Sequence, residues 1–136
     1  MTQQDKELLF TDLCSRLPYH VRLKVWLKDG TTEEGALDLE HNYGDVLRDA
    51  FYYNKIIDIK PYLRPMSSMT EEEKRELEKI IDGILGYNAK NYFHSEDDYN
   101  WNTLYNTHDW LNSHHFDYRG LISKGLALEA PKGMYK

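Results

Sequence analysis

The segment Val21–Leu27 constrains the fold most, because its side chains alternate strictly between aliphatic residues and polar or amphipathic ones. The sequence VRLKVWL has an aliphatic residue at every odd position. Successive side chains of a β-strand point to opposite faces, so this pattern predicts a strand with one buried face and with Trp26 on the other face. Lys28, Asp29 and Gly30 provide a turn. The following segment 31–40, TTEEGALDLE, is then expected to form the second strand of a hairpin.

Two further strands are expected after this hairpin. A turn at 42–45 is followed by strand candidates at 46–53 and 55–60. Pro61 and Pro65, in KPYLRP, are expected to end the sheet because proline cannot donate a backbone hydrogen bond. Three to five short strands joined by tight turns are best closed as a small antiparallel sheet or SH3-like barrel, because closure removes exposed edges.

Helices are predicted on both sides of the sheet. Between Asp5 and Leu17 apolar residues recur every three or four positions, which is typical of an amphipathic helix, and Pro18 closes the run. Thr70 and Glu73 have the spacing of a capping box, so a second helix is expected over 69–85.

The region after this second helix has no clear hydrophobic period. Gly83 and Gly86 are expected to weaken the helix end, and residues 87–106 predict an ordered aromatic loop. Short helical turns are expected at 109–115 and 118–124, with Gly125 as a C-terminal stop.

The expected fold is therefore α+β, with a small sheet or barrel flanked by an N-terminal helix and C-terminal helices. A chain of 136 residues has the size of one domain with one core. This single domain, 1–136, is expected to comprise a helix at 1–18, the sheet or barrel at 19–65, and helices with the aromatic loop at 66–136. The lone cysteine, Cys14, is expected to be buried as a small apolar residue.

Charge and hydropathy exclude some classes of function. The chain has 17 basic and 23 acidic residues and a net charge of −6, so its surface as a whole is not expected to attract nucleic acid or anionic lipid. No segment has the pattern of a signal peptide or of a membrane span, so a cytoplasmic location and no membrane partner are expected. No cofactor is predicted.

Three segments resemble a known family. They read KELLFTDLCSRLPY, IIDIKPYLRPMSSMTEEE and DWLNSHHFDYRGLISKGLALEAPKGMYK, and they cover a little under half of the chain. In them the chain is similar to a family of small uncharacterised proteins from gut-bacterial genomes, prophages and mobile elements. The family has no established activity, so the resemblance supplies no catalytic residue. It implies an accessory protein of phage or mobile-element origin that acts inside a bacterial cell.

The leading functional hypothesis is a non-enzymatic module that binds an unidentified protein partner. Clustered tyrosine and tryptophan side chains are enriched at protein interfaces, and the aromatic region combines such rings with acidic residues. Its predicted contact residues are Tyr92, Phe93, Tyr99, Trp101, Tyr105 and Trp110. The competing interpretation is that these rings cover the core of a small domain.

Two alternatives remain open at this stage. The first is nucleic-acid binding on the hairpin face that carries Arg22, Lys24, Trp26 and Lys28, although the net charge opposes it. The second is a small metal-dependent enzyme that uses the histidine and acid cluster. Its candidate ligands are His108, His114, His115 and Asp117, whose spacing matches no known metal motif. No catalytic residue is predicted.

Overall fold

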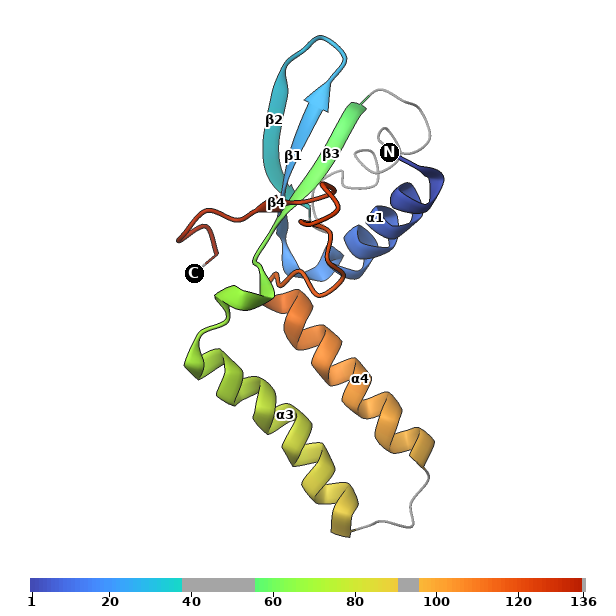
Figure 1. Cartoon of the computed structure of the whole chain (residues 1–136), viewed down its shortest axis with the longest axis vertical. Helices are drawn as coiled ribbons and strands as arrows, with labels where there is room; N and C mark the ends of the chain where they lie inside the picture. Colours follow the sequence, from blue (N-terminus) through green and yellow to red (C-terminus); the bar gives the residue numbers. More distant parts are fainter. Residues whose placement is uncertain (38–55, 91–95, 136) are drawn as a thin grey trace.

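The protein consists of a sheet covered on one face by a helix, and of a long helical hairpin that extends away from the sheet (Figure 1). The structure is a computed structural model that describes residues 1–37, 56–90 and 96–135, and describes side chains outside 82–104. The elements are α1 (Gln3–Ser15), β1 (Val21–Leu27), β2 (Thr32–Leu37), β3 (Ile56–Leu63), α3 (Glu71–Lys90), α4 (Glu96–Ser113) and β4 (Leu128–Glu129), with short 3-10 turns at Leu17–Tyr19 and Met66–Ser68. This arrangement confirms the α+β class.

The described strands form an open mixed sheet in the order β2-β1-β3-β4. β1 pairs antiparallel with both β2 and β3, and this register places Lys24 opposite Glu34 on one side and Lys60 on the other. The prediction of a closed SH3-like barrel is wrong for the described residues, because β2 and β4 lie at opposite edges and do not pair. The predicted strand at 46–53 lies outside the described residues.

The prediction that the sheet ends at Pro61 is wrong. β3 continues to Leu63, and Pro61 is buried opposite Leu23. The neighbouring Arg22 N–H and Tyr62 C=O both bond the Tyr135 hydroxyl, at 2.8 and 2.7 Å, so both groups point into the space between β1 and β3. Along a β-strand the backbone N–H and C=O groups of successive residues point to alternate sides. The Pro61 nitrogen therefore faces away from β1, and no hydrogen bond between β1 and β3 is lost at this position.

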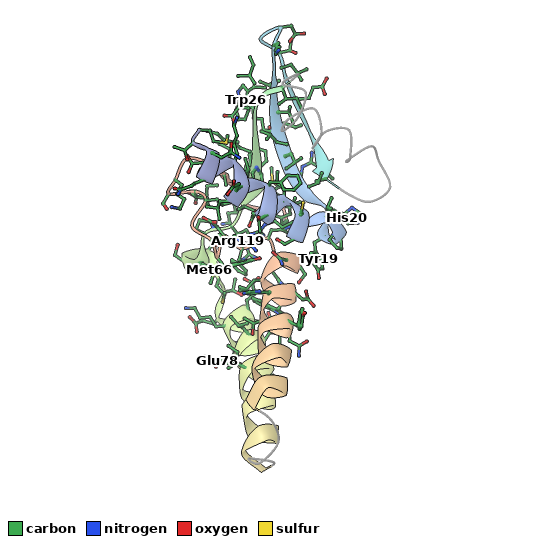
Figure 2. The ribbon with its side chains drawn as sticks, turned by 90° about the vertical axis from the view of Figure 1, so that its right-hand side faces the viewer. Tyr19, His20, Trp26, Met66, Glu78 and Arg119 are labelled. Carbon is green, nitrogen blue, oxygen red and sulfur yellow. The ribbon has the colours of Figure 1, made fainter. Side chains whose placement is uncertain are left out.

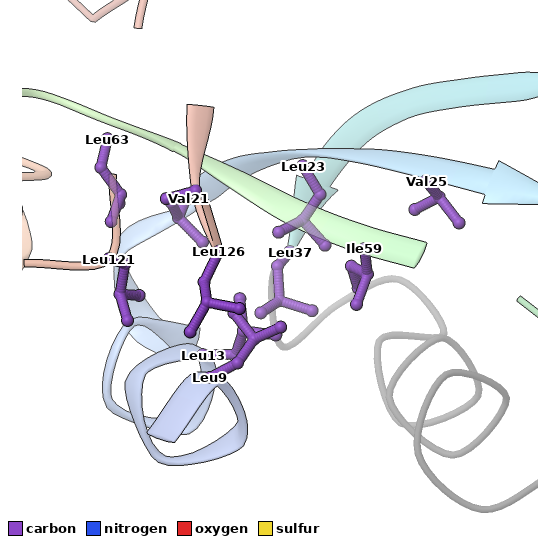
Figure 3. Packing of buried hydrophobic residues seen from close by; sticks show 11 residues of the cluster. Leu9, Leu13, Val21, Leu23, Val25, Leu37, Ile59, Leu63, Leu121 and Leu126 are labelled. Atoms are coloured by element: carbon purple, nitrogen blue, oxygen red, sulfur yellow. The ribbon is translucent and has the colours of Figure 1, made fainter. Parts of the chain in front are cut away.

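The hydrophobic core lies between α1 and the inner face of the sheet (Figure 3). Leu9 and Leu13 of α1 are fully buried, and the C-terminal segment adds Leu121 and Leu126. The inner face of the sheet contributes Val21, Leu23, Val25, Leu37, Ile59 and Leu63. Cys14 is only half-buried at the margin of this core, and burial raises its pKa.

The helical hairpin is longer than the sequence predicted. α3 runs through Gly83 and Gly86 to Lys90, and α4 occupies most of the predicted aromatic loop, from Glu96 to Ser113. α3 and α4 pack on each other, and this tertiary packing stabilises helices whose local sequence is unfavourable. Residues 118–124 form turns rather than a helix, and Gly125, at φ 73°, ends the last turn.

Candidate functional site

Arg64 joins the helical hairpin to the sheet. Its guanidinium donates two hydrogen bonds of 2.7 Å to the Glu73 carboxylate in the first turn of α3, and it lies 4.2 Å from the centre of the Phe116 ring. Glu73 also accepts from Thr70 N–H as part of the predicted capping box. These hydrogen bonds hold the pKa of Glu73 at about 2.

The other side of the junction is formed by the segment after α4. Arg64 N–H donates to the His115 carbonyl at 2.7 Å, and Asp117 N–H donates to the Arg64 carbonyl at 2.8 Å. The Trp110 ring of α4 stacks with the rings of both His114 and Phe116, with ring-centre distances of 4.0 and 5.8 Å. The base of the hairpin is therefore held by backbone bonds, an ion pair and stacked rings together.

The predicted contact aromatics fall into three groups. Tyr105 is 65% exposed on α4, whereas Trp110 is half-buried in the stack at the hairpin base. Tyr99 and Trp101 lie on α4, but their side chains are outside the described part of the structure, as are Tyr92 and Phe93 entirely. The structure thus places Tyr105 and Trp110 on the same helix, α4, which also contains Tyr99 and Trp101.

An open groove of about 570 Å³ lies at the base of the hairpin. Ile80 of α3 and Trp110 of α4 line it together with Tyr19, which follows α1 in the chain. Burial and the neighbouring Asp109 carboxylate raise the pKa of Tyr19. The groove therefore combines an aliphatic side chain, two aromatic rings and an acid at its rim.

The net charge of the chain is concentrated in the hairpin. Residues 71–113 contain ten acidic and four basic residues, and the rest of the chain contains thirteen of each. α4 alone has four acidic residues and no lysine or arginine. The whole net charge of −6 thus belongs to the hairpin, and the remainder of the chain is neutral.

The predicted metal ligands each have another structural role. His108 stacks on Tyr118 and His114 on Trp110, while the Asp117 carboxylate accepts hydrogen bonds from Leu121 N–H and Ile122 N–H at 2.7 and 2.9 Å. Among the side chains that the structure describes, at 1–37, 56–81 and 105–135, no three histidine, cysteine or acidic groups lie together as a metal site would require.

Among the histidines that the structure describes, His115 is the buried one, and its backbone is left-handed, at φ 64°, as is that of His20. The His115 ring stacks on Tyr135 at 3.7 Å, and its Nδ1 atom has no hydrogen-bond partner within the described chain. Burial, helped by the positive charge of Arg16, lowers the pKa of His115 to about 4. His115 is therefore neutral at pH 7. The His115 side chain lines a larger cleft of about 1060 Å³. Arg64 also lines this cleft, but its guanidinium is paired with Glu73.

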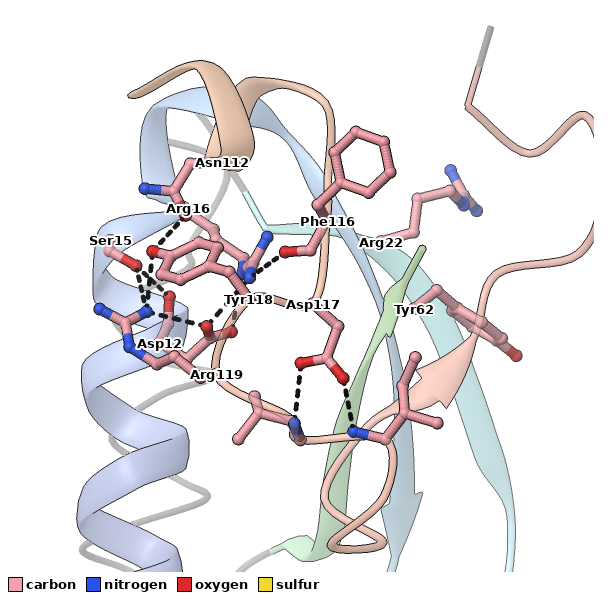
Figure 4. A network of polar contacts seen from close by, with 12 residues as sticks. Asp12, Ser15, Arg16, Arg22, Tyr62, Asn112, Phe116, Asp117, Tyr118 and Arg119 are labelled. Carbon is pink, nitrogen blue, oxygen red and sulfur yellow. Dashed lines mark hydrogen bonds and ion pairs between the residues drawn. The ribbon is translucent and has the colours of Figure 1, made fainter. Parts of the chain in front are cut away.

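A buried polar network ties α1 to the segment that follows α4 (Figure 4). The Asp12 carboxylate accepts from Arg16 at 2.8 and 3.0 Å and from Arg119 at 2.9 Å, and Arg16 also donates to the Phe116 carbonyl at 2.7 Å. Asp12 and Arg16 are completely buried. Apart from Arg16 Nη1, which has no hydrogen-bond partner among the described residues, these groups satisfy one another. We therefore assign the network to stability rather than to a ligand site.

The residues of the predicted nucleic-acid face lie on the side of the sheet opposite α1. Trp26 is half-buried there, with the ammonium groups of Lys24 and Lys60 at 5.5 and 5.7 Å from its ring. Arg22 shares this face, and Lys28 is exposed in the turn after β1. Figure 2 places Trp26 and Glu78 of α3 toward opposite ends of the molecule.

Sequence reasoning missed the residues that join or extend these surfaces. Arg64 gave no signal, because its partners His114 and Glu73 are 50 and 9 residues away. Lys60 and Tyr62 could have been placed on the face of Trp26 by their alternation with buried Ile59 and Leu63, but Pro61 was interpreted as the end of the sheet.

In comparisons with known proteins, no protein-family model, curated protein or solved structure matches the chain. None of the helices in the described part of the chain is long and apolar enough to cross a membrane.

Proposed function

We propose that the protein is a non-enzymatic protein-binding module and that the α3–α4 hairpin provides its contact surface. The observation that carries this proposal is the incomplete burial of the described apolar side chains of α3. Leu77, Ile80 and Ile81 form the apolar stripe of α3, yet none of the side chains at 71–81 is fully buried. An apolar stripe that two helices cover only partly gains stability when a partner completes it.

The attachment of the hairpin favours a rigid binding element. Arg64, Glu73 and Phe116 hold the first turn of α3 and the end of α4 at the sheet. A preformed surface loses little conformational entropy on binding, which increases the affinity available from a given contact area. The exposed ring of Tyr105 and the groove beside Trp110 supply the aromatic contacts that dominate many interfaces.

The charge of the hairpin indicates the chemistry of the partner. A surface that carries a net charge of −6 attracts a basic protein surface and repels an acidic one. We therefore expect association to be faster at low ionic strength. The origin in a phage or mobile element stays a prediction from the family resemblance.

Site-specific photo-crosslinking tests the proposal. A photoreactive phenylalanine analogue at Tyr105 is compared with the same analogue at Ile57, because the two native side chains are 65% and 64% exposed. In lysate of the organism that encodes the chain, we expect a discrete crosslinked protein from position 105 and none from position 57. Equal labelling from both positions, or none from position 105, contradicts the proposal.

A second pair of variants separates loss of binding from loss of folding. Ile80→Asp places a charge in the groove, whereas Lys74→Asp changes an exposed side chain of the same helix. We expect Ile80→Asp to abolish the crosslink from position 105 while the far-ultraviolet spectrum stays unchanged, and we expect Lys74→Asp to retain the crosslink. An unaffected crosslink in folded Ile80→Asp would show that the groove is not part of the interface.

A further inference from the structure

The outer face of the sheet carries cations together with aromatic rings. We define the outer sheet face as the face opposite α1. Its members are Arg22, Lys24 and Trp26 of β1, Glu34 of β2, and Asp58, Lys60 and Tyr62 of β3. In the part of the chain that the structure describes, no helix covers this face (Figure 1).

Two lysines of this face lie directly opposite each other. Lys24 pairs with Lys60 across β1 and β3, and both ammonium groups are within 6 Å of the Trp26 ring. Like charges at directly opposed positions destabilise a sheet. An anion placed between the two ammonium groups gains attraction from both and removes their mutual repulsion, so the pair favours an anionic ligand.

The acids of the face offset its positive charge only in part. Glu34 lies opposite Lys24 on β2 and accepts a hydrogen bond from the Tyr62 hydroxyl, and Asp58 forms an ion pair of 3.8 Å with the Lys60 ammonium. Among the residues that the structure describes, Arg22 and Lys24 have no ion pair. The face therefore has three cations against two acids, and Lys28 adds a fourth cation where β1 ends. Its sign is opposite to that of the hairpin.

The two rings are spaced along the strands. Tyr62 lies beside Arg22, and Trp26 is four residues from Arg22 on β1, which corresponds to about 13 Å of strand. Consecutive nucleotides of a stacked strand advance by about 3.4 Å, so this distance spans roughly four of them. Aromatic rings on an open sheet that stack on unpaired bases are a recurrent mode of single-strand recognition.

We propose that the outer sheet face binds single-stranded nucleic acid. The bases stack on Trp26 and Tyr62, and the phosphates lie against Arg22, Lys24 and Lys60. When a strand binds, the lysine side chains turn from the Trp26 ring to the phosphates, which frees the ring for a base. The hairpin keeps its negative charge away from this face, since Trp26 and Glu78 lie toward opposite ends of the molecule (Figure 2). This site is independent of the protein-binding surface.

The test is a fluorescence-anisotropy titration of the full chain with a labelled twelve-nucleotide oligo-dT or oligo-U. A duplex of equal length and an acidic oligoglutamate peptide serve as comparators. We expect the single strand to bind more tightly than either comparator. With three phosphate contacts, the logarithm of the association constant is expected to fall with the logarithm of salt concentration with a slope of about −2.

Charge reversals at matched positions separate a built site from general attraction. Lys24→Glu and Lys6→Glu change the net charge equally, but Lys6 is exposed on α1, which lies on the other side of the sheet. We expect Lys24→Glu to weaken binding about tenfold and Lys6→Glu to change it less than twofold. Trp26→Ala should weaken binding roughly tenfold or more, and Trp26→Phe should restore part of the loss.

Several outcomes overturn the inference. They are an absence of binding at low salt, equal effects of Lys24→Glu and Lys6→Glu, and binding of oligoglutamate as tight as that of the single strand. The last outcome would identify an acidic protein as the ligand instead. Ile80→Asp serves as the independent check, because it disrupts the hairpin groove and should leave the titration unchanged.

Discussion

The sheet body and the helical hairpin are stabilised in different ways. In the body, Leu9 and Leu13 are fully buried, and the charged side chains of Asp12 and Arg16 are buried as a bonded pair. In the hairpin, the apolar stripe on α3 is only half-buried, and the surface carries the net charge of the chain. The difference indicates that the body maintains the fold, whereas the hairpin has apolar surface left to bury against a partner.

The largest effect is expected from removing the anion of the buried network. Asp12→Ala leaves Arg16 and Arg119 without their shared carboxylate, and should lower the free energy of unfolding by about 3–5 kcal/mol in urea denaturation. Asp58→Ala is the control, because Asp58 is partly exposed and 3.8 Å from Lys60, and should cost less than about 1 kcal/mol. Similar losses of unfolding free energy for Asp12→Ala and Asp58→Ala would contradict the conclusion that the buried network stabilises the body more than the partly exposed ion pair does.

An intermediate difference in stability is expected between equivalent truncations of an aliphatic side chain in the sheet body and in the hairpin. Leu13→Ala opens a cavity in the core and should cost about 2–5 kcal/mol, whereas Ile80→Ala removes a half-buried side chain and should cost about 1 kcal/mol or less. Thermal and urea unfolding measure both variants. If Ile80→Ala proves as costly as Leu13→Ala, the stripe on α3 is core, and the proposed contact surface is lost.

The smallest effect concerns the joint between the two regions. Because the pKa of Glu73 is about 2 in the folded protein and 4.5 without its partners, Glu73 stabilises the fold above pH 4.5, and this contribution disappears as the pH falls toward 2. Glu73→Gln can still accept from Thr70 N–H but loses the ion pair with Arg64. It should therefore cost about 1–2 kcal/mol at pH 7, after allowance for partial exposure.

The same variant predicts a pH signature. The difference in unfolding free energy between the parent protein and Glu73→Gln should be constant above pH 5 and should shrink between pH 4.5 and pH 2. Urea denaturation at a series of pH values measures this difference. A difference that does not change with pH would mean that the Arg64 ion pair does not stabilise the junction.

The parts of the fold that sequence predicted are those with strong local signals. The alternation of Val21–Leu27 and the capping box of Thr70 and Glu73 located β1 and the start of α3. α4 was missed because its asparagine, aspartate and threonine residues are weak helix formers, and its helix depends on packing against α3. The barrel was inferred from a strand count that included 46–53, outside the described residues.

The candidate surfaces could be predicted only in part, because they combine residues of one strand with residues that are distant in sequence. Trp26 and Lys24 share one strand, so their common face follows from local alternation. Lys60 reaches the same ring only through the pairing of β3 with β1, which no local pattern reveals. The groove between Tyr19, Ile80 and Trp110 likewise joins three elements that are distant in sequence.

The concentration of negative charge in the hairpin makes the molecule a large electric dipole. Such a dipole rotates in the field of a charged particle before any atoms touch. A polyanion would meet the sheet end first, and a basic protein would meet the hairpin end first, so the two classes of ligand would dock at opposite poles and could occupy the protein at the same time.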